Sequence, residues 1–259
     1  MNKGGTADFD SSLQKVRTFF HETKVVIINM LFRRKAVLII HGFAGGLKDN
    51  EYLATELEFT GKYDVFTFTL PGHHKDTLKT KDYHDWINKS KRMVERIQEK
   101  YHTIYLVGHS MGGVIASYLA TQYPIKKLVL VAPAFEYLAK DRILEDIKNL
   151  PKKKQEKEVD TLYSHLAYNL LHVSLSSALA FTRLVKDYHD CPKQIECPTL
   201  ILHGVQDEVV PISASYYVYN ALASKRKKLI PLDDTRHNVF RTEKREEAAI
   251  EVKKFLGGI

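Results

Sequence analysis

The 259-residue sequence predicts an α/β fold in which a mostly parallel central sheet is flanked by helices and carries a helical insertion. Short apolar runs rich in β-branched residues alternate with stretches of helical period along most of the chain. The runs are continuously apolar, which is typical of parallel strands covered on both faces. A chain of this length can bury roughly 70 to 75% of its extended surface, so one large core is expected.

The first half of the chain shows the alternation clearly. The apolar run 63–70 follows a stretch of helical spacing that ends at Gly61, and Trp86, Met93 and Val94 recur at helical spacing ahead of the next run. The predicted strands here are residues 25–32, 36–40, 63–70 and 103–107, and the predicted helices are residues 49–59, 82–101 and 111–123.

The second half repeats the pattern after one interruption. Pro124 closes the preceding helix, a buried strand candidate follows at once, and Pro211 begins a later helix. The predicted strands are residues 127–132, 199–203 and 227–232, and the predicted helices are residues 211–223 and 243–256.

The interruption, residues 133–191, contains no convincing strand, and its leucines recur at helical spacing between residues 162 and 171. We therefore expect a core of residues 1–132 and 192–259 with a helical cap of residues 133–191. An insertion at the carboxyl edge of a parallel sheet lies where ligands bind, which favours a lid over the site. Extra packing on the edge of the sheet is the alternative.

The strongest chemical signal is the pattern Gly108-His109-Ser110-Met111-Gly112, which follows the strand 103–107. It is the G-x-S-x-G motif in the strand, turn and helix setting that presents a serine nucleophile. So sharp a turn needs flanking residues without bulk, which Gly108 and Gly112 provide. The motif predicts that Ser110 is a nucleophile.

A serine hydroxyl is a poor nucleophile at neutral pH, so it needs an imidazole to take its proton and a carboxylate to orient that imidazole. Asp207 lies in a glycine-containing loop after the strand 199–203, and His237 lies between the last strand and the last helix. The sequence thus predicts Ser110, Asp207 and His237 as a catalytic triad. Glu208 is the alternative carboxylate, because only one of two adjacent side chains is expected to face the imidazole.

The other histidines near predicted strand ends receive no catalytic role. His73, His74, His109 and His203 would each need a separate carboxylate in order to act as a base. We interpret them as loop and strand-end residues.

Negative charge that develops on a substrate oxygen needs preorganised hydrogen-bond donors. The N–H of Met111, at the start of a helix, is one candidate. The second is the N–H of Phe43 in the loop 41–46, whose glycines let the main chain approach a ligand. Phe43 and Met111 are therefore the predicted oxyanion hole.

Together these motifs resemble the α/β-hydrolase superfamily, and within it small bacterial carboxylesterases and monoacylglycerol lipases with a helical cap. The matching segments are His-Gly-Phe at 41–43, Leu-Pro-Gly-His at 70–73, Gly-His-Ser-Met-Gly-Gly at 108–113, the loop 204–211 and His237. The resemblance implies a serine ester hydrolase that acts on small to medium acyl esters, such as monoacylglycerols, without a metal or organic cofactor. It also implies that Ser110 is acylated while His237 acts as base and acid and Asp207 orients it.

Two positions depart from the family pattern. Arg236 precedes His237 where a small residue is common, and His74 follows Leu-Pro-Gly-His where glycine is common. Neither is a triad member. The alternatives are other chemistry on the same triad, namely carbon–carbon hydrolysis, thioester hydrolysis or acyl transfer, and a ligand-binding protein without turnover.

The net charge of +8 and the isoelectric point near 9.2 would suit an anionic partner. The Lys and Arg clusters lack the interleaved aromatic residues of a nucleic-acid module, so we expect solvated faces and no nucleic acid partner. Weak attraction to anionic lipid is the remaining interpretation. The expected partner is a small-molecule ester, and the sequence makes no prediction of oligomeric state.

Cysteine usage and hydropathy favour a cytoplasmic protein. Residues 25–32 form an apolar segment that is too short to cross a bilayer, so no stable membrane insertion is expected. Residues 11–24 fit either a short helix or a loop. Cys191 and Cys197 are too few for a disulfide framework, so we expect reduced thiols, and no cysteine or histidine spacing suggests a metal.

Overall fold

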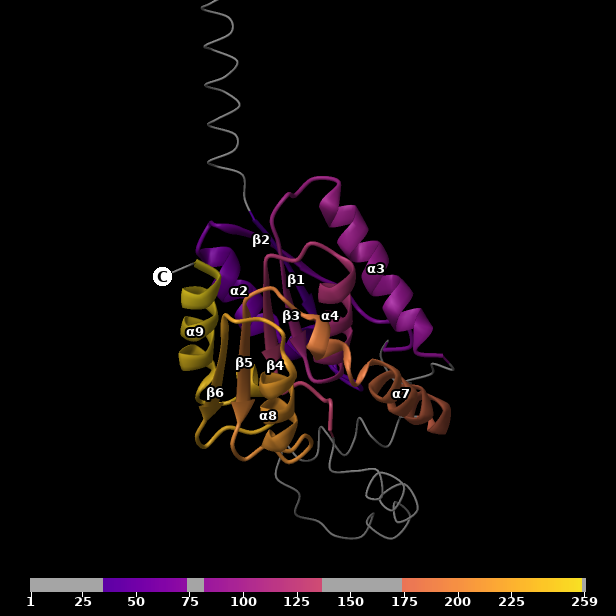
Figure 1. Cartoon of the computed structure of the whole chain (residues 1–259). Coiled ribbons are helices and arrows are strands. Elements are labelled where there is room, and N and C mark those ends of the chain that lie inside the picture. Colours follow the sequence, from indigo (N-terminus) through magenta and orange to yellow (C-terminus); the bar gives the residue numbers. More distant parts are fainter. Residues whose placement is uncertain (1–34, 74–81, 137–173, 258–259) are drawn as a thin grey trace, which may run out of the picture. The chain divides into compact units, whose positions relative to one another are not determined.

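The computed structural model describes residues 35–73, 82–136 and 174–257, and the described strands form one six-stranded parallel sheet (Figure 1). The strands are β1 (Lys35–Ile40), β2 (Tyr63–Thr67), β3 (Ile104–His109), β4 (Lys127–Val131), β5 (Thr199–Gly204) and β6 (Lys227–Leu232). Their order across the sheet is β2-β1-β3-β4-β5-β6. The predicted α/β fold class is confirmed.

Helices cover both faces of this sheet (Figure 1). The described helices are α2 (Glu51–Phe59), α3 (His84–Gln98), α4 (Met111–Gln122), α7 (Leu175–Tyr188), α8 (Ile212–Ala221) and α9 (Arg245–Gly257). Short 3-10 segments are η1 (Leu47–Asp49), η2 (Cys191–Gln194) and η3 (Val239–Arg241). One core cluster joins the sheet to α3, α4, α7 and α8, and the other joins it to α2 and α9.

The strand β1 shows why the apolar runs are continuous. Ala36, Leu38 and Ile40 pack into the cluster with α3 and α4, whereas Val37 and Ile39 pack into the cluster with α2 and α9. Because side chains alternate across a strand, a strand that is covered on both faces must be apolar at every position.

The arrangement of strands defines where a ligand site belongs. β1 pairs with β2 on one side and with β3 on the other, so the chain reverses its direction of travel across the sheet at β1. In open α/β sheets, ligands bind outside the carboxyl ends of the strands at such a switch point. Gly42 follows β1 and Ser110 follows β3, so both lie at this position.

Several predicted boundaries differ from those observed. The strand predicted over residues 63–70 ends at Thr67, because the chain turns and the N–H of Leu70 bonds to the ring of His41. The helix predicted from residue 49 begins at Glu51, after the 3-10 turn η1.

Some predicted elements lie outside the described residues. They are the segment 11–24, the strand 25–32 and residues 137–173 of the cap. Within the predicted cap, the described part includes the helix α7, where the Tyr188 ring packs 4.2 Å from the Tyr118 ring of α4. None of the helices in the described part of the chain has the length and apolar composition that a bilayer crossing requires.

Candidate active site

Ser110 lies between the last residue of β3 and the first residue of α4, in a backbone conformation that is rare for serine. Its φ is +55° and its ψ is −120°. Its N–H donates to the carbonyl of Val131 at 2.9 Å, and its carbonyl accepts from Gly113 at 2.8 Å and Ala134 at 3.2 Å. These bonds hold the strained turn at the carboxyl edge of the sheet.

The glycines on either side of Ser110 are required by close backbone packing. A Cβ at Gly108 would overlap the carbonyl of Gly112, and a Cβ at Gly112 would overlap the carbonyl oxygens of Ile40 and His41. The elbow and the end of β1 therefore meet backbone to backbone, which only glycine permits.

Asp207 and His237 are brought together by the loops after β5 and β6. The Nδ1 of His237 lies 2.7 Å from the Oδ2 of Asp207. The Oδ1 of Asp207 accepts hydrogen bonds of 2.8 Å from the N–H groups of Val209 and Val210. Burial alone would raise the pKa of Asp207, but the charge of His237 and hydrogen bonds from His203, His237 and Val210 hold that pKa well below its usual value.

Glu208 also contacts His237, but through its backbone. The N–H of His237 donates to the Oε2 of Glu208 at 3.3 Å, while the imidazole takes Asp207 as its partner. On the other side, the carbonyl of His237 accepts from the Nε2 of His109 at 3.1 Å. The rings of His109 and His237 lie 5.0 Å apart, so the residue next to Ser110 adjoins the imidazole.

The loop after β1 lies directly against the nucleophile. A Cβ at Gly42 would be 3.0 Å from the Cβ of Ser110 and 3.5 Å from its Oγ. The His41 ring fixes this loop, because its Nδ1–H donates to the Gly42 carbonyl at 2.8 Å and its Nε2 accepts from Leu70 at 3.0 Å. The structure thus places the main chain of Gly42 beside Ser110, with Phe43 next along the chain, and the N–H of Met111 at the first turn of α4.

Aromatic side chains hold the outer face of the same loop. The Phe43 ring stacks on Phe181 of α7 at 5.0 Å and meets the edge of Trp86 at 6.0 Å. Trp86 is fully buried. The position of the Phe43 backbone therefore depends on packing against both α3 and α7.

Three buried histidines have structural roles that the sequence analysis missed. Each places a ring N–H on a backbone carbonyl, with His41 bonded to Gly42, His109 to His237 and His203 to Val210. Burial and the nearby charge of His237 lower the pKa of His109 to about 4, so its ring is neutral at pH 7. The available signal was position, because all three lie at or just past the carboxyl end of a buried strand.

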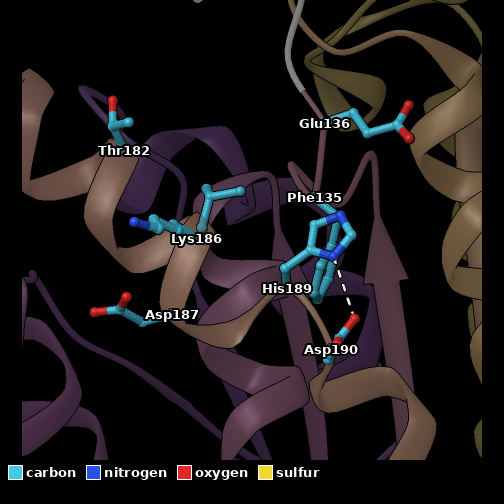
Figure 2. Close-up of a pocket in the computed structure, with 8 residues that line it drawn as sticks. Phe135, Glu136, Thr182, Lys186, Asp187, His189 and Asp190 are labelled. Carbon is cyan, nitrogen blue, oxygen red and sulfur yellow. Dashed lines mark hydrogen bonds and ion pairs between the residues drawn. The ribbon is translucent and has the colours of Figure 1, made fainter.

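A cavity of about 590 Å³ is lined by residues of the segment after β4 and by residues of α7 and the turn that follows α7 (Figure 2). Phe135 and Glu136 line one side of it, and Thr182 and Lys186 of α7 line the other. Ala134, whose N–H donates to the Ser110 carbonyl, immediately precedes Phe135 and Glu136 in the chain. The cavity thus adjoins the segment that supports the elbow, and its lining combines the apolar Phe135 and Val185 with charged side chains such as Glu136 and Lys186.

A parallel sheet with a serine elbow after a central strand, followed in chain order by the carboxylate and the imidazole, defines the α/β-hydrolase class. Within that class, the chain belongs to the serine aminopeptidase S33 family, whose model matches residues 33–245.

Individual relatives agree with this family assignment. The thermostable monoacylglycerol lipase of Bacillus sp. strain H-257 is 28% identical over 78% of this chain and 82% of the lipase. The carboxylesterase of Bacillus subtilis strain 168 is 22% identical over 86% of this chain and 92% of the esterase. The solved structure of a monoacylglycerol lipase from Paleococcus ferrophilus shares the fold, with a TM-score of 0.67 and 20% identity over 85% of this chain and 93% of that one.

The family and these relatives make the chain a serine ester hydrolase. This confirms the predicted class and reaction, and it does not favour carbon–carbon hydrolysis, thioester hydrolysis, acyl transfer or a binding protein without turnover.

Proposed function

We propose that Ser110 is the nucleophile of this hydrolase, that His237 is its general base and acid, and that Asp207 orients His237. The observation that carries the assignment is the 2.7 Å contact between His237 Nδ1 and Asp207 Oδ2. A carboxylate on Nδ1 leaves Nε2 as the nitrogen that can exchange a proton with a serine. We also assign the N–H groups of Phe43 and Met111 as the oxyanion hole.

The reaction follows from these roles. His237 takes the hydroxyl proton as the Oγ of Ser110 bonds to the ester carbonyl carbon, and the two N–H groups stabilise the oxyanion. Collapse of this intermediate breaks the bond to the alcohol, which leaves with the proton from His237. A water molecule then attacks the acyl-serine by the same route and releases the carboxylic acid.

The proposed substrates are small to medium acyl esters, including monoacylglycerols. Support comes from relatives named as monoacylglycerol lipases and carboxylesterases and from the cavity beside Phe135. We further propose that residues 133–191 form a cap on a core of residues 1–132 and 192–259. The proposal of a cap is supported by α7, which lies within residues 133–191 and whose Phe181 packs on Phe43.

Covalent labelling tests the nucleophile. A fluorophosphonate probe is expected to label the wild-type protein and to leave Ser110→Ala unlabelled, because the probe reacts only with an activated serine. Ser117→Ala is the matched control, since Ser117 is a buried serine of α4. Folded wild-type protein that resists the probe would contradict the proposal.

Substrate profiling distinguishes ester hydrolysis from the aminopeptidase activity for which the family is named. We expect hydrolysis of p-nitrophenyl esters and of a monoacylglycerol to exceed hydrolysis of aminoacyl p-nitroanilides. Faster cleavage of the anilides would assign the site to peptides.

We also propose a cytoplasmic location with weak attraction to anionic lipid. Both cysteines are free, and burial raises the pKa of Cys191 to about 12 and that of Cys197 to about 11, which keeps them as unreactive thiols. Fractionation of the source cells tests the location. Sedimentation with anionic vesicles at low and high salt tests the attraction to lipid.

A further inference from the structure

His203 is a buried histidine that the proposed triad does not use. It lies in β5 and is completely shielded from solvent. Its Nε2 is 3.0 Å from the carbonyl oxygen of Val210 and 3.3 Å from the Oδ2 of Asp207, and its Nδ1 is 2.7 Å from the Oγ of Ser215. Both ring nitrogens therefore have partners inside the protein.

These partners determine where the ring carries its hydrogen. The carbonyl of Val210 can only accept, so Nε2 must be the nitrogen that donates. Nδ1 of the neutral ring then accepts from the hydroxyl of Ser215, which is also fully buried, in the first turns of α8. The carbonyl of Val210 and the carboxylate of Asp207 thereby select the tautomer with its hydrogen on Nε2, and the Ser215 hydroxyl satisfies Nδ1.

His203 contacts one oxygen of the Asp207 carboxylate directly and also holds the residue that binds the other oxygen. Its Nε2 approaches Oδ2, the same oxygen that receives the imidazole of His237. It also holds the carbonyl of Val210, the residue whose N–H donates to Oδ1 at 2.8 Å. The carboxylate is thus held by His203 as well as by His237.

We propose that His203, with Ser215 behind it, is a positioning residue that fixes the orientation of the Asp207 carboxylate and thereby the imidazole of His237. This inference rests on the proposed triad and extends it to a chain of four side chains, Ser215, His203, Asp207 and His237. The hydrogen bond from His203 is also one of the contacts that lower the pKa of Asp207, which keeps the carboxylate ionised.

The test compares His203→Phe, which keeps an aromatic ring without a donor, with His203→Gln, whose amide nitrogen can still donate. Turnover of a p-nitrophenyl ester is measured per active site titrated with a fluorophosphonate. We expect His203→Phe to lower kcat by about tenfold or more while KM stays within about twofold, because a misplaced catalytic group slows chemistry more than binding. His203→Gln is expected to recover most of that loss.

A spectroscopic readout separates positioning from mere support of the fold. The downfield proton resonance of the His237 Nδ1–H, identified by its absence in His237→Gln, is expected to shift or broaden in His203→Phe. Ser215→Ala, a gentler change that avoids a failure to fold, should give a smaller effect of the same kind. Ser117→Ala is its matched control, since within the described residues the buried Oγ of Ser117 has no hydrogen-bond partner.

Wild-type kcat per titrated site in both His203→Phe and Ser215→Ala would overturn the inference. An unmoved resonance combined with no rescue by glutamine would also overturn it, because only packing would then be affected. These results leave the proposed function intact if the wild type is labelled and Ser110→Ala is not, whereas failure of that labelling removes the triad itself.

Discussion

Asp207 and Glu208 are adjacent in the sequence and both contact His237, but they contact different parts of it. Asp207 meets the imidazole, and Glu208 accepts from the backbone N–H. The two carboxylates can therefore be separated by mutation.

Asp207→Asn is expected to lower kcat by about 10⁴-fold, because an amide does not stabilise the imidazolium or fix its tautomer. Glu208→Gln is expected to cost less than about tenfold, since its amide oxygen can still accept from the backbone. Ester hydrolysis by both variants, each checked for folding, is the measurement. A reversed order would make Glu208 the orienting group.

Some residues of the site can be recognised from the sequence, and others cannot. Ser110, Asp207 and His237 could be proposed from the sequence because each follows a recognisable strand and their order matches a known chemistry. His41 and His203 were not assigned a role, because each binds a backbone carbonyl. Every residue has a backbone carbonyl, so the sequence does not indicate which carbonyl a histidine will bind.

At the scale of elements, α7 supports the loop that follows β1. Phe181 of this helix stacks on Phe43 in the loop that carries the proposed oxyanion donor. Leu184, one turn further along α7, is fully buried in the core but is not part of that stack.

We expect Phe181→Ala to lower both stability and kcat, and Leu184→Ala to lower stability alone. Both changes delete a buried side chain, at a cost of about 2 to 5 kcal/mol each, but only the first removes the support of Phe43. Urea unfolding and ester turnover, measured at a temperature where both variants are folded, distinguish the two effects. Equal losses of kcat in the two variants would show that α7 does not act through Phe43.

The strands were easier to predict than their ends. Continuous apolar composition identified β1, β3, β4 and β5, because burial on both faces excludes polar side chains. The end of β2 at Thr67 depends on the bond between Leu70 and His41, a contact between distant segments that local composition does not encode.

At the scale of the whole molecule, the fold class followed from the alternation of strands and helices. The sequence proposes the bounds of a cap but not how it packs, because amphipathic spacing predicts helices without predicting their neighbours. The same limit applies to the cavity beside Phe135, whose walls come from the segment after β4 and from α7 with the residues that follow it.

The ionised Asp207 makes the stability of the whole protein depend on pH. Its pKa in the folded state lies below the ordinary value of 3.8, so the unfolded chain binds a proton first as the pH falls. Asp207 therefore contributes stability above that value, and the contribution is lost as the pH falls below it. We expect the free energy of unfolding of the wild type to decrease more steeply than that of Asp207→Asn between about pH 5 and about pH 3.

Urea denaturation of both proteins across this range is the measurement, and the difference between their unfolding free energies is the quantity to follow. A difference that stays constant or grows as the pH falls would contradict the lowered pKa.

The three histidines that bind backbone carbonyls have a consequence for how this enzyme can be altered. Their partners, at Gly42, His237 and Val210, are main-chain atoms, and a carbonyl remains when the side chain there is exchanged. At Val210, therefore, a new side chain can be introduced without removing the link to His203. The hydrogen bonds that orient these three rings are thus tied to the backbone, so they do not depend on which side chains stand at residues 42 and 210.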